Sequence, residues 1–102
     1  MRSAVAAMAV LIFVPAFSLR AEEAARLMAE TCVTCHSTEA HAHSTIPPLD
    51  GRPAGELLRI LLAFRDGTRP ATIMDRIARG YSREQLGALV GEISRRSVDG
   101  LP

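Results

Sequence analysis

The chain has 102 residues, which is enough for one domain. Its 12 basic residues are all arginine and nearly balance 11 acidic residues, so the formal net charge is +1, which excludes a basic nucleic-acid-binding protein. With 4% aromatic residues, no Trp and two Cys, the chain has little material for a large hydrophobic core.

The first residues are typical of a secretory signal peptide. Arg2 supplies a positive charge, a mostly apolar run over residues 4–17 follows, and small residues up to Ala21 suit cleavage. We therefore predict a signal peptide over residues 1–21 with cleavage near Ala21, a periplasmic location, and a mature domain over residues 22–102. The alternative is an uncleaved anchor, but the run is shorter than the roughly 20 residues that span a bilayer. We expect no membrane span in the mature chain.

The rest of the chain has the hydrophobic periodicity of helices, and no strand pattern is visible. Helices are expected over residues 22–32, 53–64, 71–80 and 82–96, with a polar loop over 37–46 and a rigid turn over 47–51. The predicted fold class is therefore all-α, with about four helices.

The predicted helices differ in their apolar faces. The helix over residues 53–64 is apolar around much of its circumference and should be largely buried, and Asp66-Gly67 should end it. The next helix carries an apolar stripe at helical spacing, made of Met74, Ile77, Ala78 and Tyr81.

The last predicted helix opens with a capping box of Ser82 and Gln85. Gly87 and Gly91 should allow it to approach the first helix closely. Its buried stripe is expected to consist of Leu86, Leu89, Val90 and Ile93.

Two thiols three residues apart, followed at once by an imidazole, form the most specific motif of the chain: Cys32, Cys35 and His36. This is the spacing of c-type haem attachment. On one turn of helix both sulfurs can reach vinyl groups of the same porphyrin, and the adjacent imidazole can ligate the iron. We predict one haem c joined covalently through Cys32 and Cys35, with His36 as the proximal iron ligand. A dithiol redox site would need a βαβ context, a zinc site would need two separated pairs of ligands, and a disulfide would leave His36 unexplained.

The distal iron ligand is predicted from the positions of the methionines. The mature chain offers only Met28 and Met74. Met28 lies one helical turn before Cys32 and would struggle to reach the opposite face of the haem, whereas a long helix separates Met74 from His36. We favour Met74, because haem iron in cytochromes c takes a His and a Met.

Several further residues have two readings. His41 and His43 could supply a second axial ligand or bind another metal, but exposed loop histidines are more often solvated. A carbonyl in the turn over residues 47–51 could accept a hydrogen bond from the His36 ring, or the turn could be an ordinary connection. The Tyr81 hydroxyl could contact the haem or a partner, or the ring could pack in the core. Arginine side chains could pair with haem propionates or simply lie in solvent at the surface, and the second is the simpler interpretation for any one of them. The candidates are Arg69, Arg76 and Arg79.

The order of these elements resembles a class I cytochrome c. The resemblance is carried by a first helix that ends in Cys32-Val33-Thr34-Cys35-His36, the turn Pro47-Pro48-Leu49-Asp50-Gly51, a late Met and a final helix. It implies a small fold of about four helices wrapped around one haem. It also implies that the Pro47 carbonyl accepts the His36 N–H and that Met74 is the sixth iron ligand.

The segments over residues 64–69 and 72–82 resemble more closely the haem subunit of flavocytochrome c sulfide dehydrogenase. In that family the cytochrome receives electrons from an FAD-containing subunit that oxidises sulfide. The resemblance implies an electron-transfer subunit with a flavoprotein partner, and no catalysis by this chain alone if both axial positions are filled. One alternative is a free-standing soluble carrier that exchanges electrons with redox donor or acceptor proteins, and a second is a haem-based ligand sensor.

The small size of the mature chain predicts a fold centred on its cofactor. Only Phe64 and Tyr81 remain as aromatic residues once the leader is removed. A domain this small seldom builds a sufficient core unaided. We therefore expect the haem-free protein to be largely unfolded.

Overall fold

The computed structural model describes residues 4–13, 16–49 and 51–99, and within these ranges the chain forms helices and no strand. The helices are α1 (Ala16–His36), α2 (Thr38–His41), α3 (Ala54–Asp66), α4 (Met74–Arg79) and α5 (Arg83–Asp99). Because α2 is a single turn, the body consists of four principal helices. The predicted all-α class is confirmed.

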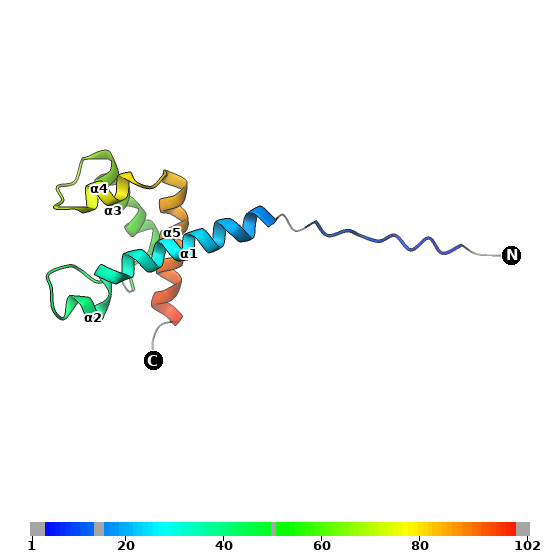
Figure 1. Cartoon of the computed structure of the whole chain (residues 1–102), viewed down its shortest axis with the longest axis horizontal. Coiled ribbons are helices and arrows are strands. Elements are labelled where there is room, and N and C mark those ends of the chain that lie inside the picture. The colour runs from blue at the N-terminus through cyan, green and yellow to red at the C-terminus, as the bar shows by residue number, and fades with distance from the viewer. Residues whose placement is uncertain (1–3, 14–15, 50, 100–102) are drawn as a thin grey trace.

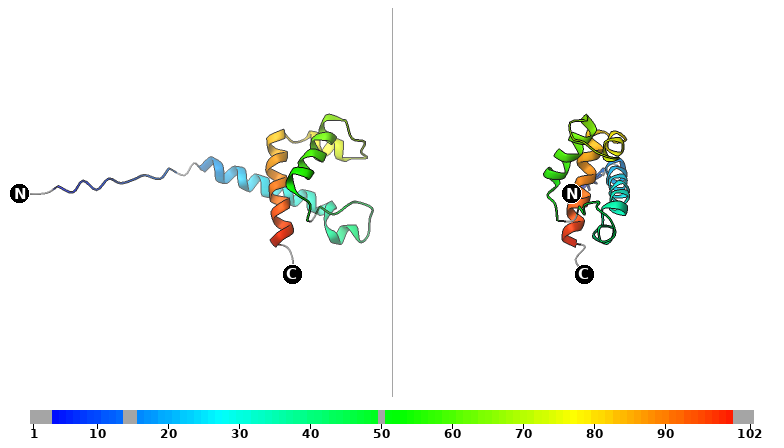
Figure 2. Two further views of the ribbon diagram at one scale, coloured as in Figure 1. Left: turned by 180° about the vertical axis from the view of Figure 1, so that it is seen from behind. Right: turned by 90° about the vertical axis from the view of Figure 1, so that its left-hand side faces the viewer.

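The helices are arranged around a crossing of α1 and α5 (Figure 1). Helix α3 packs against both α4 and α5, and α2 follows the C-terminal end of α1. The view from behind also shows that residues 4–13 run away from the helical body as an extended segment (Figure 2, left). Among the described residues, no helix is long and apolar enough to cross a membrane.

The helix ends predicted from local sequence signals are confirmed. The Gln85 side chain accepts from the Ser82 backbone N–H at 2.8 Å, and the Ser82 hydroxyl accepts from the Gln85 backbone N–H at 3.1 Å, which is a reciprocal capping box. Gly67 ends α3 with a φ of 76°, in the left-handed region that glycine adopts without strain. Gly51 has a φ of 77° in the predicted turn.

Several boundaries differ from the prediction, and α1 and α5 also end later than expected, at His36 and Asp99. Helix α1 begins at Ala16 instead of residue 22, because residues 16–21 contain neither Gly nor Pro and several strong helix formers. A one-turn helix, α2, forms in the predicted loop, where the Ser37 hydroxyl accepts from the Ala40 backbone N–H at 3.0 Å. Helix α4 begins at Met74 instead of Ala71, since it follows a proline and two β-branched residues.

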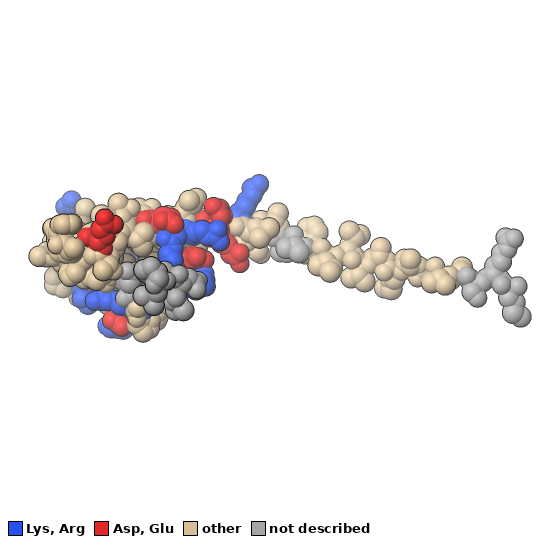
Figure 3. Space-filling view, turned by 90° about the horizontal axis from the view of Figure 1, so that it is seen from below, with Lys and Arg blue, Asp and Glu red and all other residues tan. Residues whose placement is uncertain are grey.

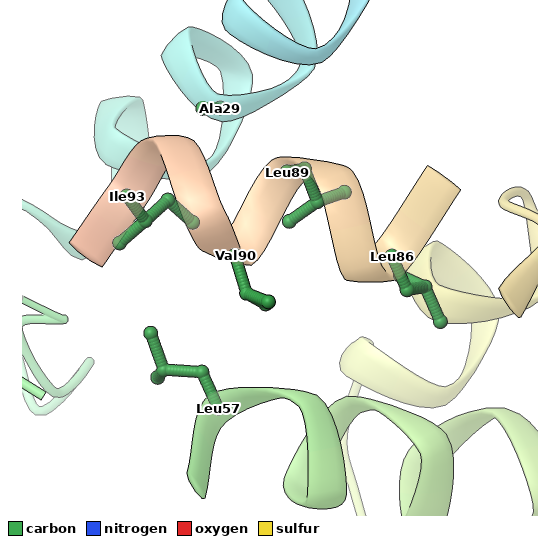
Figure 4. Packing of buried hydrophobic residues seen from close by; sticks show 6 residues of the cluster. All are labelled: Ala29, Leu57, Leu86, Leu89, Val90 and Ile93. Atoms are coloured by element: carbon green, nitrogen blue, oxygen red, sulfur yellow. The ribbon is translucent and has the colours of Figure 1, made fainter. Parts of the chain in front are cut away.

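The hydrophobic core lies where α5 meets α1 and α3 (Figure 4). Its described members are Ala29, Leu57, Leu86, Leu89, Val90 and Ile93. Leu57 of α3 points toward Val90, and Ala29 of α1 lies across the opposite side of α5. The predicted buried stripe of α5 is confirmed.

Two predictions about packing were wrong. A Cβ added at Gly87 would contact nothing, and one added at Gly91 would contact only the Arg95 side chain. These glycines are therefore not where the backbone of α1 approaches α5. The small residue at the crossing is instead Ala29. Helix α3 buries only Leu57 among its described residues, and three of its half-buried apolar side chains, Ile60, Leu61 and Phe64, face a cavity.

Polar contacts join the C-terminal part of α5 to the middle of α1. The Arg96 guanidinium of α5 lies 2.8 Å from the Glu30 carboxylate of α1 and donates to the Arg26 carbonyl at 3.3 Å. On the face shown in Figure 3, charged side chains of both signs lie close together on the body, whereas residues 4–13 carry neither sign. The fold therefore holds the second half of α1 against α5, and this half carries the thiols.

Candidate cofactor site

The last two turns of α1 present both thiols and an imidazole. Cys32 and Cys35 are unpaired cysteines three residues apart, so they lie on the same side of the helix. Cys32 is half-buried and packs against the core cluster, while Cys35 is exposed. Burial raises the pKa of the Cys32 thiol above its ordinary value, and the positive charge of Arg96 partly offsets this effect.

The His36 ring is held by the turn that follows. Its Nδ1 lies 2.7 Å from the Pro47 carbonyl oxygen. A carbonyl can only accept, so Nδ1 carries the hydrogen and Nε2 is left free as a metal ligand. The Leu49 backbone N–H also donates to the His36 carbonyl at 3.1 Å. The turn is therefore attached to the end of α1 through both the backbone and the side chain of His36.

Two adjoining cavities lie beside these residues, with volumes of about 180 and 510 Å³. Cys32, His36 and Met74 line both of them, and Cys35 and Tyr81 line the larger. The walls are mainly apolar. Those of the smaller cavity include Leu49, Leu57, Ile60, Leu61, Phe64, Val90 and Ile93. Together the cavities have the size and the apolar lining of a cofactor site.

Met74 reaches the cavities from an element far from α1 in the sequence. It is the first residue of α4, and α4 packs against α3. Met28, the other candidate thioether, packs against the core cluster and is not among the described lining residues of either cavity. The fold thus brings an imidazole and one of the two thioethers to the same space.

Two arginines line the smaller cavity. Arg69 was a candidate from the sequence, and its guanidinium also lies 5.4 Å from the centre of the Phe64 ring. Arg52 was missed, although its place directly after the turn glycine could have indicated it. Arg76 and Arg79 are not among the described lining residues, and Arg79 pairs with Asp75 at 3.8 Å. Arginine binds carboxylates well, so Arg52 and Arg69 are the residues suited to the acidic groups of a porphyrin.

The two loop histidines have different surroundings. His41 Nδ1 lies 2.8 Å from the Ile46 carbonyl oxygen. His43 is exposed. Neither is among the described residues that line the two cavities, so the geometry does not favour either as an axial ligand.

These residues fit a covalently attached haem. Two thiols on one helical turn, an oriented imidazole and a thioether share one apolar space, which is the donor set of a His/Met haem site. The described residues include no group of three or more His, Cys, Asp or Glu side chains that could hold a separate metal ion.

Helices that cross around an apolar space with these donors define a small all-α cytochrome c fold. No known protein-family model matches the chain. The chain is similar to the cytochrome subunit of sulfide dehydrogenase from Chlorobaculum tepidum, with 28% identity over 86 residues, which are 81% of this chain and 78% of that protein. The resemblance predicted from the sequence is thereby confirmed, and it supports an electron-transfer cytochrome.

Proposed function

We propose that this chain is a periplasmic electron-transfer protein with one haem c. The haem is attached through Cys32 and Cys35, with His36 and Met74 as the axial ligands. Its electron donor is an FAD-containing subunit that oxidises sulfide. The observation that carries the proposal is the convergence of Cys32, His36 and Met74 on the same cavities, with the His36 ring oriented by the Pro47 carbonyl.

A bound haem would supply a one-electron couple between ferric and ferrous iron. The protein's own residues determine how that couple is used. The Pro47 carbonyl orients the His36 ring with Nε2 free, and Met74 offers a second donor, so a haem held by both residues would have no position open to a substrate. The apolar walls exclude water and lower the local dielectric constant. This arrangement suits electron transfer, and sulfide oxidation belongs to the flavoprotein.

Export is supported by the N-terminal residues. The segment over residues 4–13 is apolar and extends away from the helical body, with Val5, Met8, Leu11 and Phe13 among its exposed side chains. It contributes no buried residue to the core. Among the described residues up to Ala21 none belongs to the buried core, as expected of a cleaved leader.

The partner is proposed to dock at the mouth of the larger cavity, defined by Ile46, Ile73 and Ile77. Their exposed fractions are 37%, 57% and 40%. Among the described residues that line this cavity none is charged. An exposed apolar rim next to a cofactor edge is typical of a surface that another protein covers. Such a surface suits a lasting complex with a flavoprotein better than salt-dependent encounters.

A charge at the cavity mouth should weaken the complex. We expect Ile73→Glu to raise the Kd for the flavoprotein by about tenfold or more, because burying an unpaired carboxylate in an apolar interface costs more than about 1.4 kcal/mol. The matched control is Leu27→Glu on α1, whose wild-type side chain is 59% exposed and is not among the described lining residues. Titration calorimetry of both variants checks this, and equal affinities would place the interface elsewhere.

The proposed function is tested on protein exported and matured in a host that attaches haem c. Mass spectrometry should find one haem on the chain, and an FAD-containing protein should purify with it. Sulfide should then reduce the haem only when the flavoprotein is present. A chain without covalent haem contradicts the proposal as a whole. A haem-loaded chain that purifies without a flavoprotein indicates the free-standing carrier.

A further inference from the structure

Two imidazoles contact carbonyls of adjacent residues. His36 Nδ1 lies 2.7 Å from the Pro47 oxygen, and His41 Nδ1 lies 2.8 Å from the Ile46 oxygen. Since a carbonyl only accepts, both rings carry hydrogen on Nδ1 and both donate. The first ring is the proposed proximal ligand, while the second lies on α2, outside the cavities.

The segment that bears these carbonyls has few bonds of its own. Pro47 and Pro48 have no backbone N–H, so neither can donate a hydrogen bond. The Ile46 N–H donates to the Ser44 hydroxyl at 3.3 Å, and the next backbone donor is Leu49, bonded to the His36 carbonyl. Ile46 and Pro47 are both exposed, so packing holds them little. The position of this segment therefore depends on groups that donate to its carbonyls.

His41 comes from a well-anchored element. The Ser37 hydroxyl caps α2 by accepting from the Ala40 N–H, and the His41 backbone N–H donates to the Ser37 carbonyl at 3.0 Å. The Ser44 hydroxyl donates to the Ala40 carbonyl at 3.1 Å. The His41 ring thus extends from a turn of helix that directly follows the haem-attachment motif.

We propose that His41 is a positioning residue for the proximal ligand. By donating to the Ile46 carbonyl it holds the Ile46–Pro47 segment so that the Pro47 carbonyl accepts from His36 Nδ1. A hydrogen bond at Nδ1 fixes the ring orientation of a ligating histidine and raises its basicity. His41 therefore influences the iron without contacting it. The inference rests on the proposed function, because it assigns a role toward the His36 ligand.

The chain offers a matched control and a conservative rescue. His43 is an exposed histidine of the same loop, two residues further on. In His41→Asn the side-chain N–H can take the place of the ring Nδ1–H. His41→Ala removes the donor, and His41→Phe removes it while keeping a ring of similar size. Two non-donating variants are used so that a folding defect in one of them cannot be mistaken for loss of the hydrogen bond.

The test uses haem-loaded protein, and the direct measurement is solvent exchange of the His36 Nδ1–H, followed by ¹⁵N-histidine NMR in the ferrous state. We expect exchange to become about tenfold faster in His41→Ala and His41→Phe, because losing one hydrogen bond should make the His36–Pro47 contact open more easily by about 1.4 kcal/mol. Exchange should stay at the wild-type rate in His43→Ala and return toward it in His41→Asn. The reduction potential should rise in the two non-donating variants alone, because a less basic imidazole stabilises ferric iron less.

The outcomes separate this inference from the function it rests on. Wild-type protein in which His36 does not ligate haem iron overturns both, whatever the variants do. The role of His41 alone is overturned by a different result. In that case the wild-type protein protects the His36 Nδ1–H, and His41→Ala and His41→Phe exchange it as slowly as His43→Ala does. Failure of His41→Asn to restore slow exchange overturns it as well, because the effect then does not depend on the donated hydrogen bond.

Discussion

Replacing Met74 by Leu should lower the reduction potential of the haem-loaded protein and open the iron to added ligands. A thioether ligand raises the potential of a haem. Its loss should lower the potential by on the order of 100 mV, a fraction of the roughly 0.8 V over which axial ligands set haem potentials. The ferrous variant should also bind carbon monoxide, whereas the wild-type protein should resist it. Redox titration and the carbon monoxide difference spectrum measure the two effects.

Met28→Leu is the matched control for this experiment. Met28 packs against the core cluster and is not among the described lining residues of the cavities. A Met-to-Leu change nearly conserves volume, so neither variant should lose much stability. Equal potentials in the two variants would remove Met74 from the iron. Carbon monoxide binding by the wild-type protein would favour a ligand sensor over an electron carrier.

Removing both attachment thiols should abolish cooperative folding. Among the described residues eight hydrophobic side chains are buried, and three of these belong to alanine. Leu61 and Phe64 of α3 line the smaller cavity, so they gain full burial only when the cavity is filled. Each such side chain contributes about 1.5–3 kcal/mol on burial, against a total stability of about 5–15 kcal/mol for a domain. Without haem, the balance should fall close to zero.

Circular dichroism of Cys32→Ala/Cys35→Ala checks this expectation. The double variant should show reduced helical signal at 25 °C and no cooperative thermal transition. Thr34→Ala is the control, because Thr34 lies in the same helical turn and the change removes only an exposed methyl group and an exposed hydroxyl, which bonds to the Glu30 carbonyl at 3.2 Å. A haem-free double variant with a sharp transition would show that the helices pack stably by themselves.

The parts of the fold that the sequence predicted are those set by local chemistry. The capping box at Ser82 and Gln85 and the stop at Gly67 follow from interactions within a few residues, and both are present. The buried stripe of α5 follows from helical periodicity alone. The resemblance to a sulfide dehydrogenase cytochrome was read from a short run around Met74, and the similarity of most of the chain to such a subunit confirms it.

The errors arose where the outcome depends on three-dimensional neighbours. A helix that is apolar around much of its circumference was expected to be largely buried, but α3 faces a cavity. No pattern within residues 53–64 distinguishes a protein neighbour from a cofactor. Glycines at helical spacing suggested a close crossing, yet Ala29 occupies it. Arg52 and the contact of His41 with Ile46 depend on how the proline turn folds back, which periodicity does not report.

The early start of α1 has a consequence for maturation. In the full chain the first turn of α1, at Ala16, contains no acidic residue. The proposed cleavage near Ala21 would make Glu22 and Glu23 the opening turn of a shorter helix, where each carboxylate stabilises the helix dipole by about 0.3–1 kcal/mol. The buried residues Ala25 and Ala29 lie beyond the cut. The peptidase would thus create a better helix start than the one it destroys and leave the α1–α5 crossing in place.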